Sequence, residues 1–122
     1  MDNEIAAITG EAPVLDAAAL ERVQRIGGVQ LLHRMFRAFL EHVPARVEAL
    51  LQEDDAHEAA RTAHAIKSSA GNIGLERLRL LAQEAEARAE LGDDTWSELC
   101  AWIAHEMDAA RTALEAQLER SE

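Results

Sequence analysis

Apolar residues recur every three or four positions along four stretches of the chain, which is the spacing of one face of an α-helix. The longest stripe runs from Leu32 to Leu51 and passes straight through Pro44. We therefore predict one long helix there, kinked because proline lacks the backbone N–H that would bond one turn back. A helix, a break and a second helix is the alternative. The stripe consists of Leu32, Met35, Phe36, Phe39, Leu40, Val43, Val47, Leu50 and Leu51.

Three further stripes predict helices over residues 55–72, 75–91 and 95–118. Residues 71–74 turn the chain after the first of these, and the Gly-Asp-Asp run at 92–94 ends the second. A short helix over 16–25 precedes them and ends at the Gly27-Gly28 pair. The pattern predicts an all-α fold: an up-and-down antiparallel four-helix bundle with a short additional N-terminal helix that covers one end.

The chain before this pattern is polar and irregular from Met1 to Pro13, and this proline can open a helix near Asp16. We expect a flexible N-terminus over residues 1–13 and the bundle domain over residues 14–120.

Composition agrees with one small domain, because 48% of the 122 residues are apolar and only 3% are aromatic. The net charge of −11 argues against nucleic acid and anionic membrane surfaces as partners. No apolar run approaches the ~20 residues of a spanning helix, and the acidic start lacks the basic region of a signal peptide. Cys100 is the only cysteine, so no internal disulfide can form. We expect a cytoplasmic monomer.

The run from Ala63 to Leu75 places one histidine beside a lysine and several small residues. On a helix at about 100° per residue, His64 lies roughly 140° from the centre of the apolar stripe and should face water. The stripe consists of Ala59, Ala63, Ile66, Ala70 and Ile73, and the outer neighbours of His64 are Ala60, Arg61, Lys67, Ser68 and Gly71.

This outer face suits phosphoryl transfer, which needs an approachable ring nitrogen and nearby positive charge. The small neighbours leave the His64 ring open, while Arg61 and Lys67 supply charge about one turn away on either side. Taken alone, a histidine three residues before a lysine on a helix is more often a solvated surface residue than part of a functional site.

The wider motif changes that balance. From His64 the chain reads His-x-Ile-Lys-Ser-Ser-Ala-Gly-x-Ile-Gly-Leu, which closely resembles the signature of histidine phosphotransfer (HPt) domains, His-x-Leu-Lys-Gly-Ser/Ala-Ser/Ala followed by a glycine and a leucine. Residues 40–51 look like the long second helix of that family, and the resemblance extends from about Leu15 to Leu118. It implies that His64 is the phosphoacceptor and that Lys67 faces the phosphate. It also implies that Gly71 and Gly74 form the close-packed end of the helix.

Two positions depart from the family pattern. Ser68 stands where the family commonly has glycine; its hydroxyl is small enough for access, and it can bond either a phosphoryl oxygen or the His64 carbonyl. On the next helix, family members often carry a glutamine that orients the ring, and here that residue is Glu86. A carboxylate would hold the ring N–H more strongly but would repel the phosphoryl group. Gln83, one turn earlier, is the substitute candidate.

The resemblance implies a phosphorelay intermediate that accepts a phosphoryl group from a receiver-domain phosphoaspartate and passes it to another receiver aspartate. The implied partners are response-regulator receiver domains or a hybrid sensor kinase, with Mg²⁺ bound by the receiver. No cofactor and no autonomous kinase activity are expected of this chain. On the family pattern, the receiver docks on an apolar patch near the histidine, for which the candidates are Val14, Leu15, Leu20, Ile26 and Val29.

Other chemistry has little support in the sequence. None of the five histidines has the i, i+4 histidine or Glu-x-x-His spacing of a helical metal site, and no Gly-rich phosphate loop or Gly-x-Ser-x-Gly elbow is present. Two alternative functions remain. One is the phosphoacceptor helix of a sensor kinase, in which an acidic residue usually follows the histidine, whereas Ala65 follows here. The other is a purely structural helical adaptor.

Overall fold

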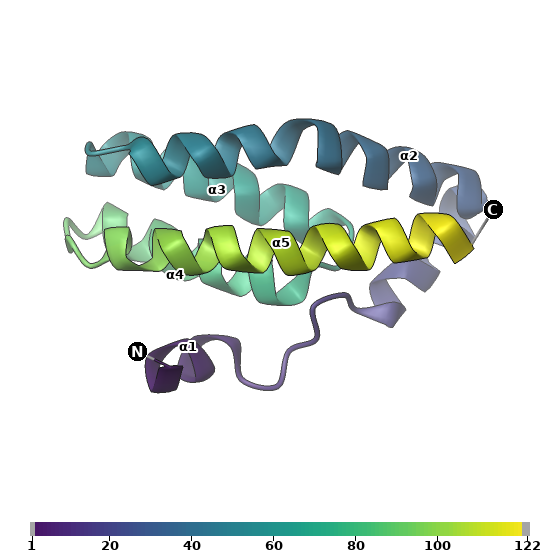
Figure 1. Ribbon diagram of the computed structural model, residues 1–122, viewed down its shortest axis with the longest axis horizontal. Coiled ribbons are helices and arrows are strands. Elements are labelled where there is room, and N and C mark those ends of the chain that lie inside the picture. The colour runs from purple at the N-terminus through teal and green to yellow at the C-terminus, as the bar shows by residue number, and fades with distance from the viewer. Residues whose placement is uncertain (1, 121–122) are drawn as a thin grey trace.

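The computed structural model describes residues 2–120 of the chain. Within that range all regular structure is helical, and Figure 1 shows how the helices are arranged. They are α1 (Asp2–Thr9), α2 (Ala17–Gln52), α3 (Ala56–Asn72), α4 (Glu76–Glu90) and α5 (Trp96–Arg120).

The four longer helices form an antiparallel bundle in which each helix contacts the next one along the chain. α2 also packs on α5, which closes the ring. The connections are short, spanning residues 53–55, 73–75 and 91–95, so each helix has to reverse direction against its predecessor. The predicted all-α bundle is confirmed. No helix within the described residues is both long enough and apolar enough to cross a bilayer.

α2 contains both features that the sequence singles out. Gly28 interrupts it with φ of 72° and ψ of −175°, conformations that are not helical. The predicted short helix over 16–25 is therefore the first part of α2, and a kink at Gly28 separates it from the rest of that helix. The helix continues without interruption through Pro44, so the single-helix prediction is confirmed there and the helix–break–helix alternative is wrong.

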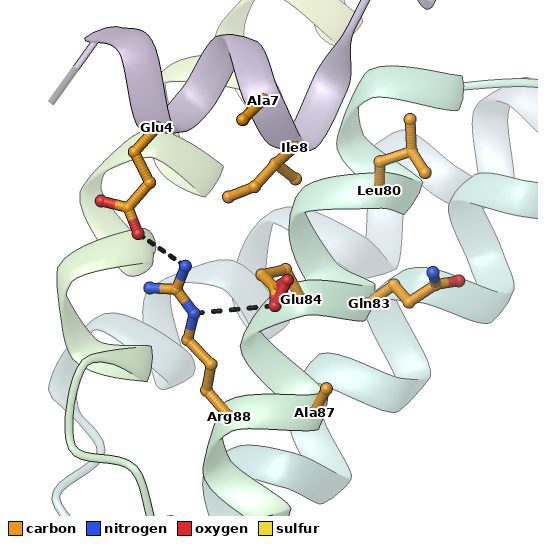
Figure 2. Close-up of a pocket in the computed structure, with 8 residues that line it drawn as sticks. All are labelled: Glu4, Ala7, Ile8, Leu80, Gln83, Glu84, Ala87 and Arg88. Atoms are coloured by element: carbon orange, nitrogen blue, oxygen red, sulfur yellow. Dashed lines mark hydrogen bonds and ion pairs between the residues drawn. The ribbon is translucent and has the colours of Figure 1, made fainter.

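The N-terminal residues differ from the prediction. Instead of an irregular segment, residues 2–9 form α1, which packs against α4. Ile5 is buried, and a 2.5 Å ion pair joins Glu4 to Arg88 of α4 (Figure 2). A helix this short is marginal in isolation, so these contacts with α4 explain a helix that the local pattern did not predict. Met1 lies outside the described residues.

The core consists of large apolar side chains contributed by all four bundle helices, with alanines where α3 meets α4. The facing residues of these two helices are small, which lets their backbones approach closely. Fully buried residues include Phe36, Leu50, Ile66, Leu78, Leu81, Leu99, Ile103 and Leu114, and the buried alanines of α3 and α4 are Ala59, Ala60, Ala63, Ala70, Ala82, Ala85 and Ala89. Cys100 lies in this core, where burial raises the pKa of its thiol to about 11.

The turn between α3 and α4 depends on Gly74. Its φ is +77°, and a Cβ atom there would lie 2.7 Å from Ala19 Cβ and 3.1 Å from the Asp16 carbonyl oxygen. The Asp16 N–H donates to the Gly74 carbonyl oxygen at 2.8 Å. Gly74 thus combines a left-handed turn with the close contact that docks the start of α2 onto the bundle.

We predict that Gly74→Ala lowers the free energy of unfolding by about 2–5 kcal/mol, because a left-handed penalty of about 1–2 kcal/mol adds to an overpacking cost of about 1–3 kcal/mol. Gly92→Ala is the matched control: Gly92 has φ of +73° but open space around its missing Cβ, and should lose only about 1–2 kcal/mol. Urea unfolding of both variants measures the difference. Equal losses would show that the contact with Ala19 and Asp16 adds nothing.

Candidate functional site

His64 lies in the middle of α3 and points out of the bundle. Asp55 caps the start of this helix by accepting the His57 N–H at 3.3 Å. The inner face of α3 is buried through Ala59, Ala63 and other stripe residues, whereas 59% of the His64 side-chain surface is exposed. The predicted outward orientation of His64 is confirmed.

A single carboxylate on α4 contacts both of the main predicted site residues on α3. Glu86 Oε2 lies 2.7 Å from His64 Nδ1, and Glu86 Oε1 lies 2.5 Å from Lys67 Nζ. Only 12% of the Glu86 side-chain surface is exposed, compared with 27% for Lys67. The sequence suggested a contact between His64 and Glu86 but not that Lys67 shares the same carboxylate.

The charge state of Glu86 fixes the hydrogen-bond direction. Burial raises the pKa of its carboxyl, but the hydrogen bonds from Lys67 and His64 outweigh that effect and hold the pKa below its ordinary value. The ionised carboxylate can only accept, so His64 Nδ1 carries the proton. In the neutral ring, Nε2 then holds the free lone pair on an exposed side chain.

Gln83, the substitute for Glu86, does not contact the ring. It is exposed on α4, and its side-chain oxygen accepts from Arg79 Nη1 at 3.1 Å. Arg79 also forms an ion pair with Glu76. Figure 2 shows Gln83 at the edge of the depression between α1 and α4, so the geometry favours Glu86 as the ring's partner.

The remaining predicted residues surround the ring without contacting it. Arg61 is exposed, with its nearest carboxylate, Glu58, at 3.7 Å. Ser68 is exposed, and its hydroxyl has no hydrogen bond within residues 2–120, so the bond to the His64 carbonyl is absent there. Gly71 is exposed, and a Cβ there would lie 3.3 Å from Arg79 Cδ.

A shallow depression of about 320 Å³ lies beside the ring, between α3 and α4. It is lined by His57, Ala60, Arg61, His64, Glu86 and Glu90. No group of three or more His, Cys, Asp or Glu residues within the part of the chain that the structure describes could hold a metal ion. The site therefore offers an open imidazole flanked by cations.

Comparison with protein families agrees with this site. The family model for the Hpt domain matches residues 32–121, which include α3, α4 and every residue around His64 described above. The chain belongs to the Hpt domain family. Members are histidine phosphotransfer modules of two-component phosphorelays that interact with receiver domains and kinases and lack autonomous kinase activity. Neither the curated proteins nor the solved structures contain a match to this chain.

The lowered pKa of Glu86 predicts a pH dependence of stability. The contribution of this carboxylate is full above about pH 4.5, its ordinary value, and is lost as the pH falls through the lower folded-state value. Glu86→Gln should therefore lower the free energy of unfolding by about 1–2 kcal/mol at pH 7, with a smaller difference from the wild type below about pH 4.

Urea unfolding between pH 3 and 7 tests this, with Glu90→Gln as control. Glu90 lines the same depression but forms no ion pair within residues 2–120, so its substitution should change the stability by less than about 0.5 kcal/mol. A Glu86→Gln effect that stays constant over the whole pH range would contradict the ionic role of Glu86.

Proposed function

We propose that this protein is a phosphorelay intermediate that carries a phosphoryl group on His64. It accepts the group from the phosphoaspartate of one receiver domain and passes it to the aspartate of another. The observation that carries the proposal is the exposed His64 ring, whose Nδ1–H is held by an ionised carboxylate while Nε2 remains open, in a chain of the Hpt family.

The transfer uses few groups of this chain. The Nε2 lone pair attacks phosphorus in line with the bond to the aspartate oxygen; that bond breaks, and its electrons remain on the receiver's carboxylate. Lys67 is one turn from His64 and can turn from Glu86 toward the phosphoryl oxygens, where its charge offsets theirs. The receiver supplies Mg²⁺ and the other groups that stabilise the transition state, so this chain needs no cofactor of its own.

Access to Nε2 determines how the partner approaches. The side chains around the ring are small, at Ala60, Ser68 and Gly71, and therefore leave Nε2 accessible to a partner protein. Arg61 offers a second cation to an acidic receiver site. Of the apolar docking candidates, Ile26 is 81% exposed and Val29 is 41% exposed. Val14, Leu15 and Leu20 are half-buried, so Ile26 and Val29 are the better candidates for contact. We propose that the protein acts as a monomer in the cytoplasm.

We predict that His64→Gln abolishes acid-labile, base-stable phosphorylation by phosphorylated receiver domains without unfolding the bundle, because the exposed ring contributes little to packing. The assay mixes the protein with phosphorylated receivers of the source organism and detects phosphohistidine by mass spectrometry, with circular dichroism to monitor the fold. His57→Gln is the matched control, since His57 lies on the same face and lines the same depression.

Retained labelling of His64→Gln, or loss of labelling in His57→Gln alone, would remove His64 from this role. Absence of phosphohistidine in the wild-type protein with every receiver would favour a structural adaptor.

We predict that Lys67→Ala slows transfer roughly tenfold to a thousandfold, the range for removing one charge-stabilising group from a transition state. Arg61→Ala, which removes a more exposed cation of the same helix, should have a smaller effect. Rapid-quench measurement of transfer from a phosphorylated receiver gives both rates. A Lys67→Ala rate equal to that of the wild type would leave this lysine with only its ion pair to Glu86.

A further inference from the structure

Glu86 differs from a neutral ring-orienting amide because it brings a negative charge to within 2.7 Å of the ring that is to be phosphorylated. We propose that Glu86 keeps the proton on His64 Nδ1 while Nε2 carries the phosphoryl group, so that phosphoryl enters and leaves the ring without proton exchange with water. This inference rests on the proposed role of His64. Glu86 acts through the ring and is a positioning residue.

The balance of the step shows why the proton matters. When the Nε2 lone pair forms the bond to phosphorus, the ring still holds its Nδ1 proton and becomes positively charged. In water, an imidazolium gives up a proton near neutral pH, which would leave a neutral phosphorylated ring. Onward transfer returns the P–N bonding electrons to Nε2, and it is easiest when the leaving ring is already protonated at Nδ1. A retained proton therefore serves both directions of transfer.

The charges at the site favour retention of the His64 Nδ1 proton. The ionised Glu86 carboxylate is 12% exposed, so its attraction to the charged ring is weakly screened. The phosphoryl group adds negative charge beside it, and loss of the Nδ1 proton would leave the cluster with one further uncompensated negative charge. Lys67 cannot serve both sides fully, because its ammonium is shared between Glu86 and the incoming oxygens.

The other charged groups near the ring do not replace this interaction. On α3, His57 and Arg61 line the depression next to His64; on α4, Glu90 lines it one turn beyond Glu86. A second groove, between α2 and α3, is lined by Arg46 of α2 and by Arg61. Within residues 2–120, Glu86 is the carboxylate that contacts the ring, so the retained proton depends on this residue.

The consequence is a phosphohistidine suited to rapid onward transfer of the phosphoryl group rather than to a long lifetime. With its ring protonated at Nδ1, the P–N bond stays reactive through the neutral pH range, and its reactivity changes little with pH. With a neutral amide at position 86, the ring would lose its proton as the pH rises, and the phosphohistidine would become longer-lived.

The test loads His64 of the full chain with phosphoramidate, removes the donor, and follows loss of phosphohistidine by phosphorus NMR between pH 6 and 9. The wild-type decay rate should change less than about threefold between pH 6.5 and 8.5. For Glu86→Gln, the rate should fall up to about tenfold per pH unit above neutrality, so that at pH 8 the variant's phosphohistidine outlives that of the wild type by about tenfold or more. Glu90→Gln removes the same charge from the same groove and should decay like the wild type.

A second measurement reads the proton directly. With nitrogen-15 in the histidine ring, Nδ1 of the phosphorylated wild type should show its bound proton at pH 8, and the Glu86→Gln variant should not. Parallel pH profiles for these two proteins, or a wild-type Nδ1 without a proton, would overturn the inference and leave the proposed function standing. A failure of both phosphoramidate and phosphorylated receiver domains to label His64 in the folded protein would count against the proposed function itself.

Discussion

The close packing of α3 on α4 is the constraint on which the site depends. His64 and Lys67 come from one helix and Glu86 from the other, and their contacts of 2.7 and 2.5 Å require the two backbones to lie near each other in one register. The buried alanines on the facing sides permit that approach. Any larger residue at Ala63 or Ala82 would separate the helices and so act on the site from within the core.

The second constraint is electrostatic. One partly buried carboxylate satisfies a histidine and a lysine at once, and it is the Glu86 charge that determines which ring nitrogen holds the proton. The chain carries a net charge of −11, yet the exposed face of α3 presents Arg61, Lys67 and two histidines. Arg61 and Lys67 balance the carboxylates Glu86 and Glu90 around the ring, so its local surroundings carry less negative charge than the molecule as a whole.

Much of this arrangement could be predicted from the sequence, because it follows from helical periodicity. The stripe through Ala59 and Ile66 determines that His64 faces outward, and the Gly27-Gly28 pair marks where α2 bends. The choice between Glu86 and Gln83 could not be made in this way. The two residues lie about one turn apart on α4, and only the register of α4 against α3 decides which one reaches the ring.

The N-terminal helix shows a different limit of prediction from the sequence. Its eight residues have no strong stripe of their own, and α1 is held by the burial of Ile5 and by the ion pair from Glu4 to Arg88, a residue 84 positions from Glu4. A local pattern carries no information about a contact of that kind. The family resemblance does not supply it either, since the matched region begins at residue 32.

The bond from the Asp16 N–H to the Gly74 carbonyl oxygen also bears on the order in which the protein forms. The α3–α4 and α4–α5 pairs are hairpins of neighbouring segments and close small loops, whereas the Asp16 and Glu4 contacts join distant parts of the chain at a greater entropic cost. We therefore expect the beginning of the chain to be the last part to dock during folding. The α3–α4 pair can assemble before it.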